Sequence, residues 1–352
     1  MVTKVKPALF GLQNSNRDFS QKQAWGKNQF NTAFPVSLCC YFEHHNINAI
    51  YLKITKGAFA HAEIEIAQLL GKSTQDTDTY FAFETPFLPY QKYIVGKLSR
   101  IDMVVQSLTD NSQSCGLEIK LTALPDNSTC DLKEEEDYGS ELVVRPDTIV
   151  YLACSLAHAL QDTNFLCNLI DFGIKDWSQE AQVLPHIPNM LAFLRDIYNA
   201  IEHTQTPFLL QPIWKTLARH AKLAQHCLDI FVWSNAGFLH FLTEIAGCEN
   251  PLKISRQQRT IIWLYKMLYS LSMYQKFDPK SIIDRLSYNT KNDKAFASSG
   301  NVTNPYMRCQ RLLRPSITKE AIREIILGGG QNYLSPERRF DAVLFHSPEL
   351  FS

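Results

Sequence analysis

Two strand-like segments joined by a polar turn constrain the fold more than any other part of this 352-residue sequence. The segment KYIVGKLSRIDMVVQSL, residues 92–108, is followed by the polar run TDNSQSC and then by GLEIKLTAL, residues 116–124. A turn-like polar run between two extended apolar segments is typical of an antiparallel hairpin. We therefore expect these two strands to pair within a β-sheet.

Side chains alternate between two faces along the second strand of this hairpin. Leu117, Ile119 and Leu121 point to one side, whereas Glu118 and Lys120 point to the other. A strand with one face exposed to solvent would give the same pattern without any function, so this alternative stays open.

Asp102 is the unusual residue of the first strand, because its neighbours in that strand are mostly apolar. A carboxylate buried there without a partner or a cation costs free energy. If the hairpin pairs as expected, Asp102 approaches Glu118. Two carboxylates at close range repel each other unless one is protonated or a divalent ion lies between them.

This set of residues suits the hydrolysis of a phosphodiester. A bound metal polarises the phosphoryl oxygen and generates hydroxide near neutral pH. Mg²⁺ prefers oxygen ligands, which Asp102 and Glu118 would supply, with the Ile119 carbonyl as a further ligand. Lys120, on the same face as Glu118, would orient the attacking water and stabilise negative charge.

The pattern D-(x15)-E-x-K across two strands resembles the PD-(D/E)xK nuclease superfamily, although Ile101 stands where that motif has proline. A closer resemblance, to the HindVP-type family of restriction endonucleases, lies in EIKLTALPDNST (118–129) and GKLSRID (96–102). The resemblance implies a type II restriction enzyme that uses Mg²⁺ to cut double-stranded DNA at a short palindrome such as GRCGYC. It also implies a homodimer, because a two-fold symmetric dimer can address both strands of a palindrome.

A further acidic residue is expected before the catalytic sheet, since a preceding helix often supplies one in this superfamily. The segment GAFAHAEIEIAQLLGK is helix-like over residues 57–71. Glu63 and Glu65 lie two positions apart, so at most one of them can face the site from a helix. Glu63 is the favoured candidate for the metal, and solvated glutamates remain the alternative for both.

The sequence changes character after the acidic run at 131–141. Residues 145–161 begin with Pro146-Asp147, a typical helix start, and helical spacing recurs at 187–204, 209–231, 235–247 and 255–276. We predict an α/β (α+β mixed) fold, with the central mixed β-sheet of the nuclease core, flanking helices and a large, mostly helical C-terminal portion. Residues 1–145 would hold most of the catalytic core, and residues 146–352 a recognition and dimerisation part packed with it as one unit.

Positive charge is concentrated in the second half, although the formal net charge of the chain is zero. Residues 253–294 contain nine Lys or Arg and three Asp. Such asymmetry is typical of a DNA-binding surface, and a solvated charged face is the alternative. The acidic run is expected to face away from DNA or to form a dimer or regulatory surface. The candidate DNA-binding residues are Arg256, Arg259, Lys291, Lys294, Arg308 and Arg311.

Several other classes of function find no support in the sequence. The chain has no apolar run long enough to span a membrane and no leader-like start, which favours the cytoplasm. Its nine cysteines form no CxxC pair, and the glycines at 328–330 lack the lysine of a nucleotide-binding loop. The remaining alternatives are a non-catalytic DNA- or protein-binding module and a less specific repair nuclease of the same superfamily.

Overall fold

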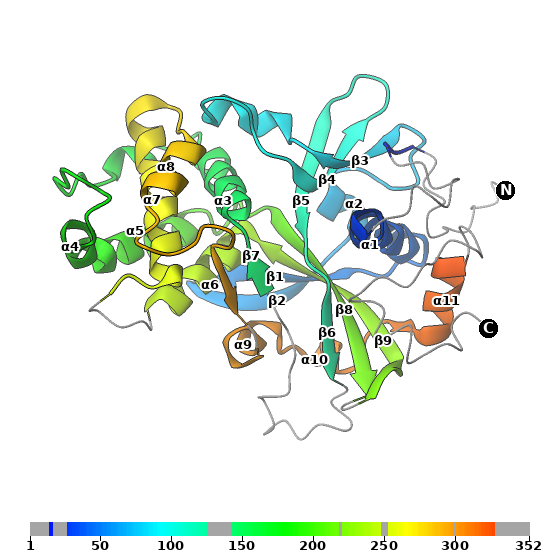
Figure 1. Ribbon diagram of the computed structural model, residues 1–352. Helices are drawn as coiled ribbons and strands as arrows, with labels where there is room; N and C mark the ends of the chain where they lie inside the picture. Colours follow the sequence, from blue (N-terminus) through cyan, green and yellow to red (C-terminus); the bar gives the residue numbers. More distant parts are fainter. Residues whose placement is uncertain are drawn as a thin grey trace.

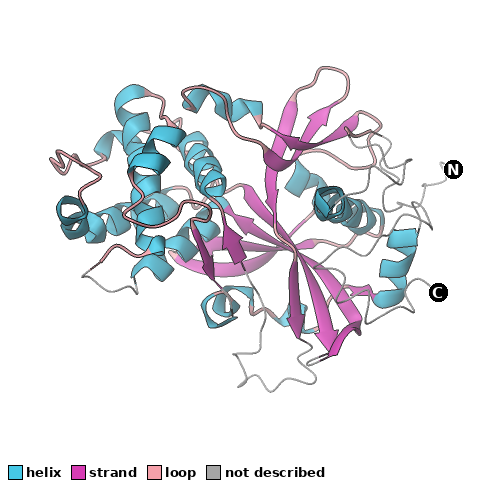
Figure 2. Ribbon diagram, viewed as in Figure 1, coloured by secondary structure: helices cyan, strands magenta, loops and turns pink. Residues whose placement is uncertain are grey.

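The computed structural model describes residues 14–16, 27–125, 142–217, 220–247, 253–298 and 300–327. A mixed β-sheet runs through the centre of the molecule, and helices pack on both of its faces (Figure 1 and Figure 2). The predicted mixed α/β fold, with a central mixed sheet and flanking helices, is confirmed.

The central sheet has nine strands in the described part of the chain. Seven of them follow the order β2-β1-β9-β8-β5-β4-β3, while β6 pairs with β8 and β11 pairs with β9. Neighbouring strands are antiparallel except for the pairs β1–β9, β5–β8 and β6–β8. The strands are β1 (Ala49–Thr55), β2 (Ala58–Ile64), β3 (Thr79–Thr85), β4 (Ile101–Ser107), β5 (Gln113–Ile119), β6 (Thr122–Pro125), β8 (Pro207–Leu217), β9 (His220–Ser234) and β11 (Ile317–Thr318).

Different helices cover the two faces of the sheet (Figure 1). One face packs against α1 (Lys27–His44), α2 (Ile66–Leu70) and α11 (Lys319–Leu327). The other packs against α3 (Pro146–Ala159), α5 (Ile187–Ala200), α6 (Asn235–Gly247) and α7 (Arg256–Tyr274). Shorter elements are α4 (Glu180–Val183), α8 (Pro279–Arg285), α9 (Asn304–Met307), α10 (Gln310–Leu313), and the 3₁₀ turns η2 (Leu88–Tyr93), η4 (Phe165–Asn168), η5 (Leu184–His186) and η6 (Gly300–Val302).

A small second sheet links the two halves of the sequence. It pairs β7 (Leu142–Val144) with β10 (Phe296–Ser298) in antiparallel register. Because α3 begins two residues after β7, this pairing holds the segment before β10 beside the start of α3.

Strand alternation divides the apolar residues into two cores. On β1, Ile50 and Leu52 join the core with α3, α5, α6 and α7, whereas Tyr51 joins the core with α1, α2 and α11. Central strands are therefore buried on both faces, which is what a sheet covered by helices on both sides requires.

The predicted helix at 209–231 is wrong, because this region forms the β8–β9 hairpin at the centre of the sheet. Leu209 and Leu210 are adjacent in sequence and both fully buried, one in each core. A strand that is apolar on both faces loses the alternation that identifies it, and short apolar runs of this kind are ambiguous between helix and strand.

The predicted helix at 57–71 is also wrong. Residues Ala58–Ile64 form β2, paired with β1, and only Ile66–Leu70 are helical. Lys56 and Gly57 both have positive φ, 52° and 74°, as the two-residue turn of a tight hairpin requires. Ala and Glu favour helices in isolation, but here pairing with β1 overrides that propensity. The predicted stop at Gly71 is confirmed, since this glycine closes α2 with φ of 68°.

Other predicted elements are confirmed. The antiparallel hairpin predicted from 92–108 and 116–124 forms between residues 101–107 and 113–119, whereas Leu88–Tyr93 is a 3₁₀ turn and not part of the first strand. Helices occupy most of 145–161, 187–204, 235–247 and 255–276. Within the described residues, no helix is both long and apolar enough to cross a membrane. Helix α1 was not predicted, because its sequence has no clear apolar periodicity.

Candidate active site

The β4–β5 hairpin brings Asp102 and Glu118 to facing positions. Met103 pairs with Leu117 and Val104 pairs with Gly116, so one further step along the same register sets Asp102 opposite Glu118. Directly opposed residues of an antiparallel pair point to the same face of the sheet. The strand register therefore sets these two residues opposite each other.

The hairpin is buried on both sides. Leu117 and Ile119 pack into the core with α1, α2 and α11, while Glu118 points toward α3 on the opposite face. Glu118 is only 9% exposed. The alternative of a solvated strand face is therefore wrong, because α3 covers the face that carries the charges.

Hydrogen bonds hold the three charged side chains in place. The backbone N–H of Ile119 donates to Oδ2 of Asp102 at 2.8 Å. The Nζ of Lys120 donates to Oε1 of Glu118 at 2.6 Å, and the same oxygen accepts from the Thr148 hydroxyl at 3.1 Å. Asp102, Glu118 and Lys120 thus form one linked group across two strands and a helix.

The group carries more negative than positive charge. Burial, followed by the neighbouring Glu118, raises the pKa of Asp102 to about 7, against the opposing effect of Lys120. Glu84 adds to the same effect. Burial also raises the pKa of Asp147, in the first turn of α3, with a contribution from Glu118. A single ammonium therefore does not balance the carboxylates around it.

Two neighbours of this group were missed in the sequence. Thr148 comes from the first turn of α3, and Glu84 lies between two β3 residues that pair with residues on either side of Asp102. Glu84 also has a positive φ of 49°. Glu84 and Thr148 are 18 and 46 residues away from Asp102 in the sequence, so no local pattern connects them to it. The one visible signal was that Glu84 is an acid at the end of the apolar segment TYFAFE.

The donor set fits a divalent cation with oxygen ligands. Asp102 and Glu118 are two facing carboxylates with a shortage of positive charge, and Mg²⁺ is commonly held by one or two carboxylates together with water and substrate oxygens. No group of three or more His, Cys, Asp or Glu side chains in the described residues is arranged to hold a metal. These residues therefore suit a metal site in which two carboxylates bind the ion and water or substrate oxygens supply the other ligands.

Glu63 is not brought to this group. It lies on β2, at the edge of the sheet, and three strands separate β2 from β5. Its carboxylate accepts hydrogen bonds from Arg311 at 3.1 Å and from Asn48 at 3.2 Å. Glu65 is the residue before α2 and does not lie on a helix that faces Asp102.

Arg311 instead belongs to a second buried charged group. It donates through Nε to Oδ2 of Asp229 at 3.1 Å and through Nη2 to Oδ1 at 3.2 Å. Ser316 donates to Asp229 as well, at 3.1 Å. Because its guanidinium joins β9, β2 and the turn after α10, Arg311 supports the fold.

Arg259 is likewise committed to the fold. It is 1% exposed, its guanidinium lies 4.4 Å from the centre of the Trp263 ring, and it donates to carbonyl oxygens of the segment before β10. The expectation of a direct DNA contact fails for this residue, because the helix face that carries it points inward.

The other predicted basic residues remain accessible. Lys291 and Arg308 are exposed, and Lys294 and Arg256 are half-buried. Lys291 and Lys294 lie just before β10, which pairs with β7 two residues before the start of α3. The acidic run 131–141 lies outside the described residues.

Comparisons with known proteins identify the chain as a type II restriction enzyme, a site-specific deoxyribonuclease. It belongs to the HindVP restriction endonuclease family, whose model matches residues 25–351. The resemblance predicted from EIKLTALPDNST and GKLSRID is therefore confirmed.

Two relatives span nearly the whole chain. One is named "Probable type II restriction enzyme HindVP", from Haemophilus influenzae; it is 48% identical over 350 residues, covering 99% of this chain and 96% of the relative. The other, "Type II restriction enzyme HgiDI" from Herpetosiphon aurantiacus, is 42% identical over 350 residues, covering 98% and 97%. No solved structure matches this chain.

Proposed function

We propose that this enzyme hydrolyses phosphodiester bonds of double-stranded DNA with Mg²⁺ held by Asp102 and Glu118. The observation that supports this most is the facing pair itself: two carboxylates from adjacent strands, with the pKa of Asp102 raised to about 7 by burial and by Glu118. Such a pair is costly in a folded protein unless a cation neutralises it. A bound Mg²⁺ would polarise the scissile phosphate and lower the pKa of a water molecule.

The remaining residues would position the reacting groups. The Ile119 N–H fixes one oxygen of Asp102, which leaves the other oxygen for the metal. Thr148 and Lys120 share Oε1 of Glu118 and so orient that carboxylate. On approach of a phosphate, the Lys120 ammonium would turn from Glu118 to the developing negative charge and orient the attacking water. The backbone carbonyl of Ile119, the residue after Glu118 on β5, remains a candidate metal ligand.

For the target, we propose a short palindrome such as GRCGYC, cut by a homodimer in which each subunit addresses one strand. Family membership supports the target class. Lys291, Lys294, Arg256 and Arg308 are the proposed DNA contacts, because they are accessible and the first two lie near the start of α3. Arg259, Arg311 and Glu63 are left out of the proposal, since each is engaged in the fold.

Digestion of a long DNA of known sequence tests this function. With Mg²⁺, we expect discrete fragments whose ends map to GRCGYC sites, no fragments from Asp102→Ala, and the same fragments formed far more slowly by Lys120→Ala. Glu63→Ala is the matched control and should cut like the wild type. A smear would contradict sequence specificity, and the absence of cleavage with every divalent ion tried would contradict the catalytic proposal.

A further inference from the structure

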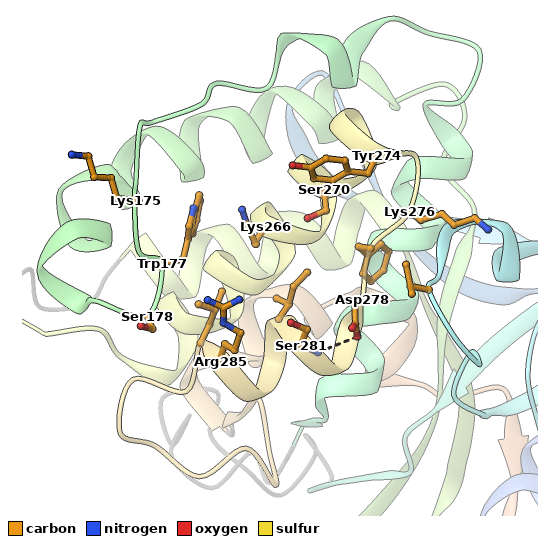
Figure 3. Close-up of a pocket in the computed structure, with 14 residues that line it drawn as sticks. Lys175, Trp177, Ser178, Lys266, Ser270, Tyr274, Lys276, Asp278, Ser281 and Arg285 are labelled. Carbon is orange, nitrogen blue, oxygen red and sulfur yellow. Dashed lines mark hydrogen bonds between the residues drawn. The ribbon is translucent and has the colours of Figure 1, made fainter.

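A cavity of about 560 Å³ lies in the helical half of the molecule, apart from Asp102 and Glu118 (Figure 3). It is formed by α7, α8, the segment around Trp177 and the residues that follow η2. None of its lining residues comes from β4, β5 or α3. Its volume lies within the range of small-molecule and cofactor sites.

The lining is rich in positive charge. Four of its 14 residues are Lys or Arg, and one, Asp278, is acidic. Figure 3 shows Lys266 and Arg285 at the centre, together with Trp177 and Ser270, whereas Lys175 and Lys276 extend away from it. The two central cations come from different helices, α7 and α8, and converge on one space.

Lys266 is the most informative residue of the cavity. Its Nζ lies 4.5 Å from the centre of the Trp177 ring and 4.8 Å from that of Tyr269. It is half-buried, and burial lowers its pKa. Among the described residues, no carboxylate forms an ion pair with it, in contrast to the ion-paired Lys72 and Lys120. A partly desolvated ammonium in this setting attracts an anion.

The acids near the cavity are already engaged. Asp278 caps α8 by accepting from the Ser281 N–H, as Figure 3 shows. Asp171 and Asp176, which act electrostatically on Lys266 and Arg285, each accept an N–H within their own turn. These carboxylates moderate the positive charge of the cavity without occupying it.

The cavity is close enough to the catalytic group for one DNA duplex to reach both. Val95 lines the cavity, and its N–H donates to the Phe277 carbonyl at 2.9 Å. Asp102 follows seven residues later, a stretch that spans at most about 25 Å. That distance corresponds to about seven base pairs, since each strand of a duplex carries a phosphate every 3.4 Å or so along its axis.

We propose that this cavity binds a backbone phosphate of duplex DNA beyond the recognition sequence, with Lys266 and Arg285 as the cations and the Ser270 hydroxyl as a further donor. The inference rests on the proposed DNA cleavage. Free phosphate and nucleotides carry the same anionic phosphate group, which these side chains would also recognise. DNA is favoured because the cavity and Asp102 lie within the reach of one duplex.

Binding of two labelled duplexes tests the proposal. Both contain GGCGCC, one with about three and one with about fifteen flanking base pairs on each side, so that only the longer reaches past the seven or so pairs estimated above. Affinity is measured with Ca²⁺ in place of Mg²⁺, over a range of salt concentrations. The variants are Lys266→Gln and Arg285→Gln, with Lys280→Gln on α8 as the charge-matched control. Because Arg285 is exposed, its variant keeps the test valid even if Lys266→Gln fails to fold.

We expect both cavity variants to bind the long duplex about fivefold to tenfold more weakly, with a salt slope reduced by about 1, and to bind the short duplex as the wild type does. Lys280→Gln should change neither. Equal losses on both duplexes, no loss on the long duplex, or no binding of either duplex would overturn the proposal.

A second titration, with inorganic phosphate and adenosine monophosphate, separates the sources. Tight binding of either that is lost in Lys266→Gln, with DNA affinity unchanged, would make the occupant a free anion. Cleavage is assayed in parallel. If binding depends on the flanks but no DNA is cleaved, only the catalytic proposal is rejected. If cleavage is the same for both flank lengths and for both cavity variants, only the phosphate-binding role of the cavity is rejected.

Discussion

Asp102, which is half-buried, and Asp229, which is fully buried, are acids on strands of one β-sheet, and their partners differ. Asp229 accepts two hydrogen bonds from Arg311 and one from Ser316. Asp102 accepts one backbone N–H and faces a second carboxylate, that of Glu118. Burial raises the pKa of both, to about 6 for Asp229 and to about 7 for Asp102.

The difference separates an acid that supports the fold from one that we propose binds a metal. The positive charge of Arg311 balances the negative charge of Asp229. Hydrogen bonds from Arg311 also connect β9 to β2 and to the turn after α10. Near Asp102, within the part of the chain that the structure describes, the Lys120 ammonium pairs with Glu118, and we propose that a bound cation supplies the remaining positive charge. The predictions below test this contrast.

The largest effect is expected for Asp102→Asn. The amide keeps the hydrogen bond from Ile119 but supplies no charge to the metal, so cleavage should fall at least about a thousandfold. Without metal, the variant should be as stable as the wild type or more so, since repulsion from Glu118 is removed. Cleavage rates and urea unfolding measure the two effects, and a clear loss of stability would contradict the contrast.

Arg311→Met should show the opposite behaviour. It leaves Asp229 as an uncompensated buried charge, so the free energy of unfolding should fall by about 3 to 5 kcal/mol. The double variant Arg311→Met with Asp229→Asn should recover much of this loss. Chemical denaturation measures both, and cleavage per folded molecule should not change. Equal stability of the wild type and Arg311→Met would show that Asp229 needs no partner.

Lys120→Ala should lower the cleavage rate about a hundredfold, because one donor to the developing charge is lost. Substrate affinity should change much less, since this interaction strengthens only in the transition state. Single-turnover rates together with duplex binding distinguish the two. A variant whose defect lies entirely in DNA binding would assign Lys120 to a phosphate contact instead.

The pKa of Asp229 predicts a pH dependence of stability. The folded-state pKa of about 6 lies above the ordinary value of 3.8, so the folded protein holds a proton that the unfolded chain releases. The contribution of Asp229 to stability therefore falls as pH rises from about 4 to about 6, by roughly 2 to 3 kcal/mol. Denaturation of the wild type and of Asp229→Asn across this range measures it, and a pH-independent difference between them would be the contrary result.

The smallest effect is expected for Glu63→Gln. Its carboxylate is 59% exposed, and exposed ion pairs contribute less than about 1 kcal/mol. Cleavage should be unchanged, because three strands lie between β2, which carries Glu63, and β5. A large loss of activity would return Glu63 to the metal site, where the sequence first suggested it.

Local patterns in the sequence sufficed for the hairpin. The polar run TDNSQSC and the alternation in GLEIKLT are contained within about twenty residues. The register that sets Asp102 opposite Glu118 also depends on an irregularity between Val105 and Gln106, which no local pattern indicates. Helices such as α3 and α7 have start signals and apolar periodicity that can be read without tertiary information.

The rest depends on long-range contacts. The central strands β8 and β9 are buried on both faces, which removes the alternation that marks a strand. Arg259 and Arg311 look like surface cations in the sequence, and only packing shows that one holds the segment before β10 and the other neutralises Asp229. Thr148 reaches Glu118 from a separate helix, so no spacing rule could have selected it.

Titration calorimetry with Mn²⁺ on the wild type, Asp102→Asn and Glu63→Gln tests most directly whether Asp102 and Glu118 form the metal site. Each protein is titrated in the presence of a duplex containing GGCGCC. We expect the wild type and Glu63→Gln to bind Mn²⁺ equally and Asp102→Asn to bind at least about tenfold more weakly. Unchanged Mn²⁺ affinity in Asp102→Asn would contradict the assignment.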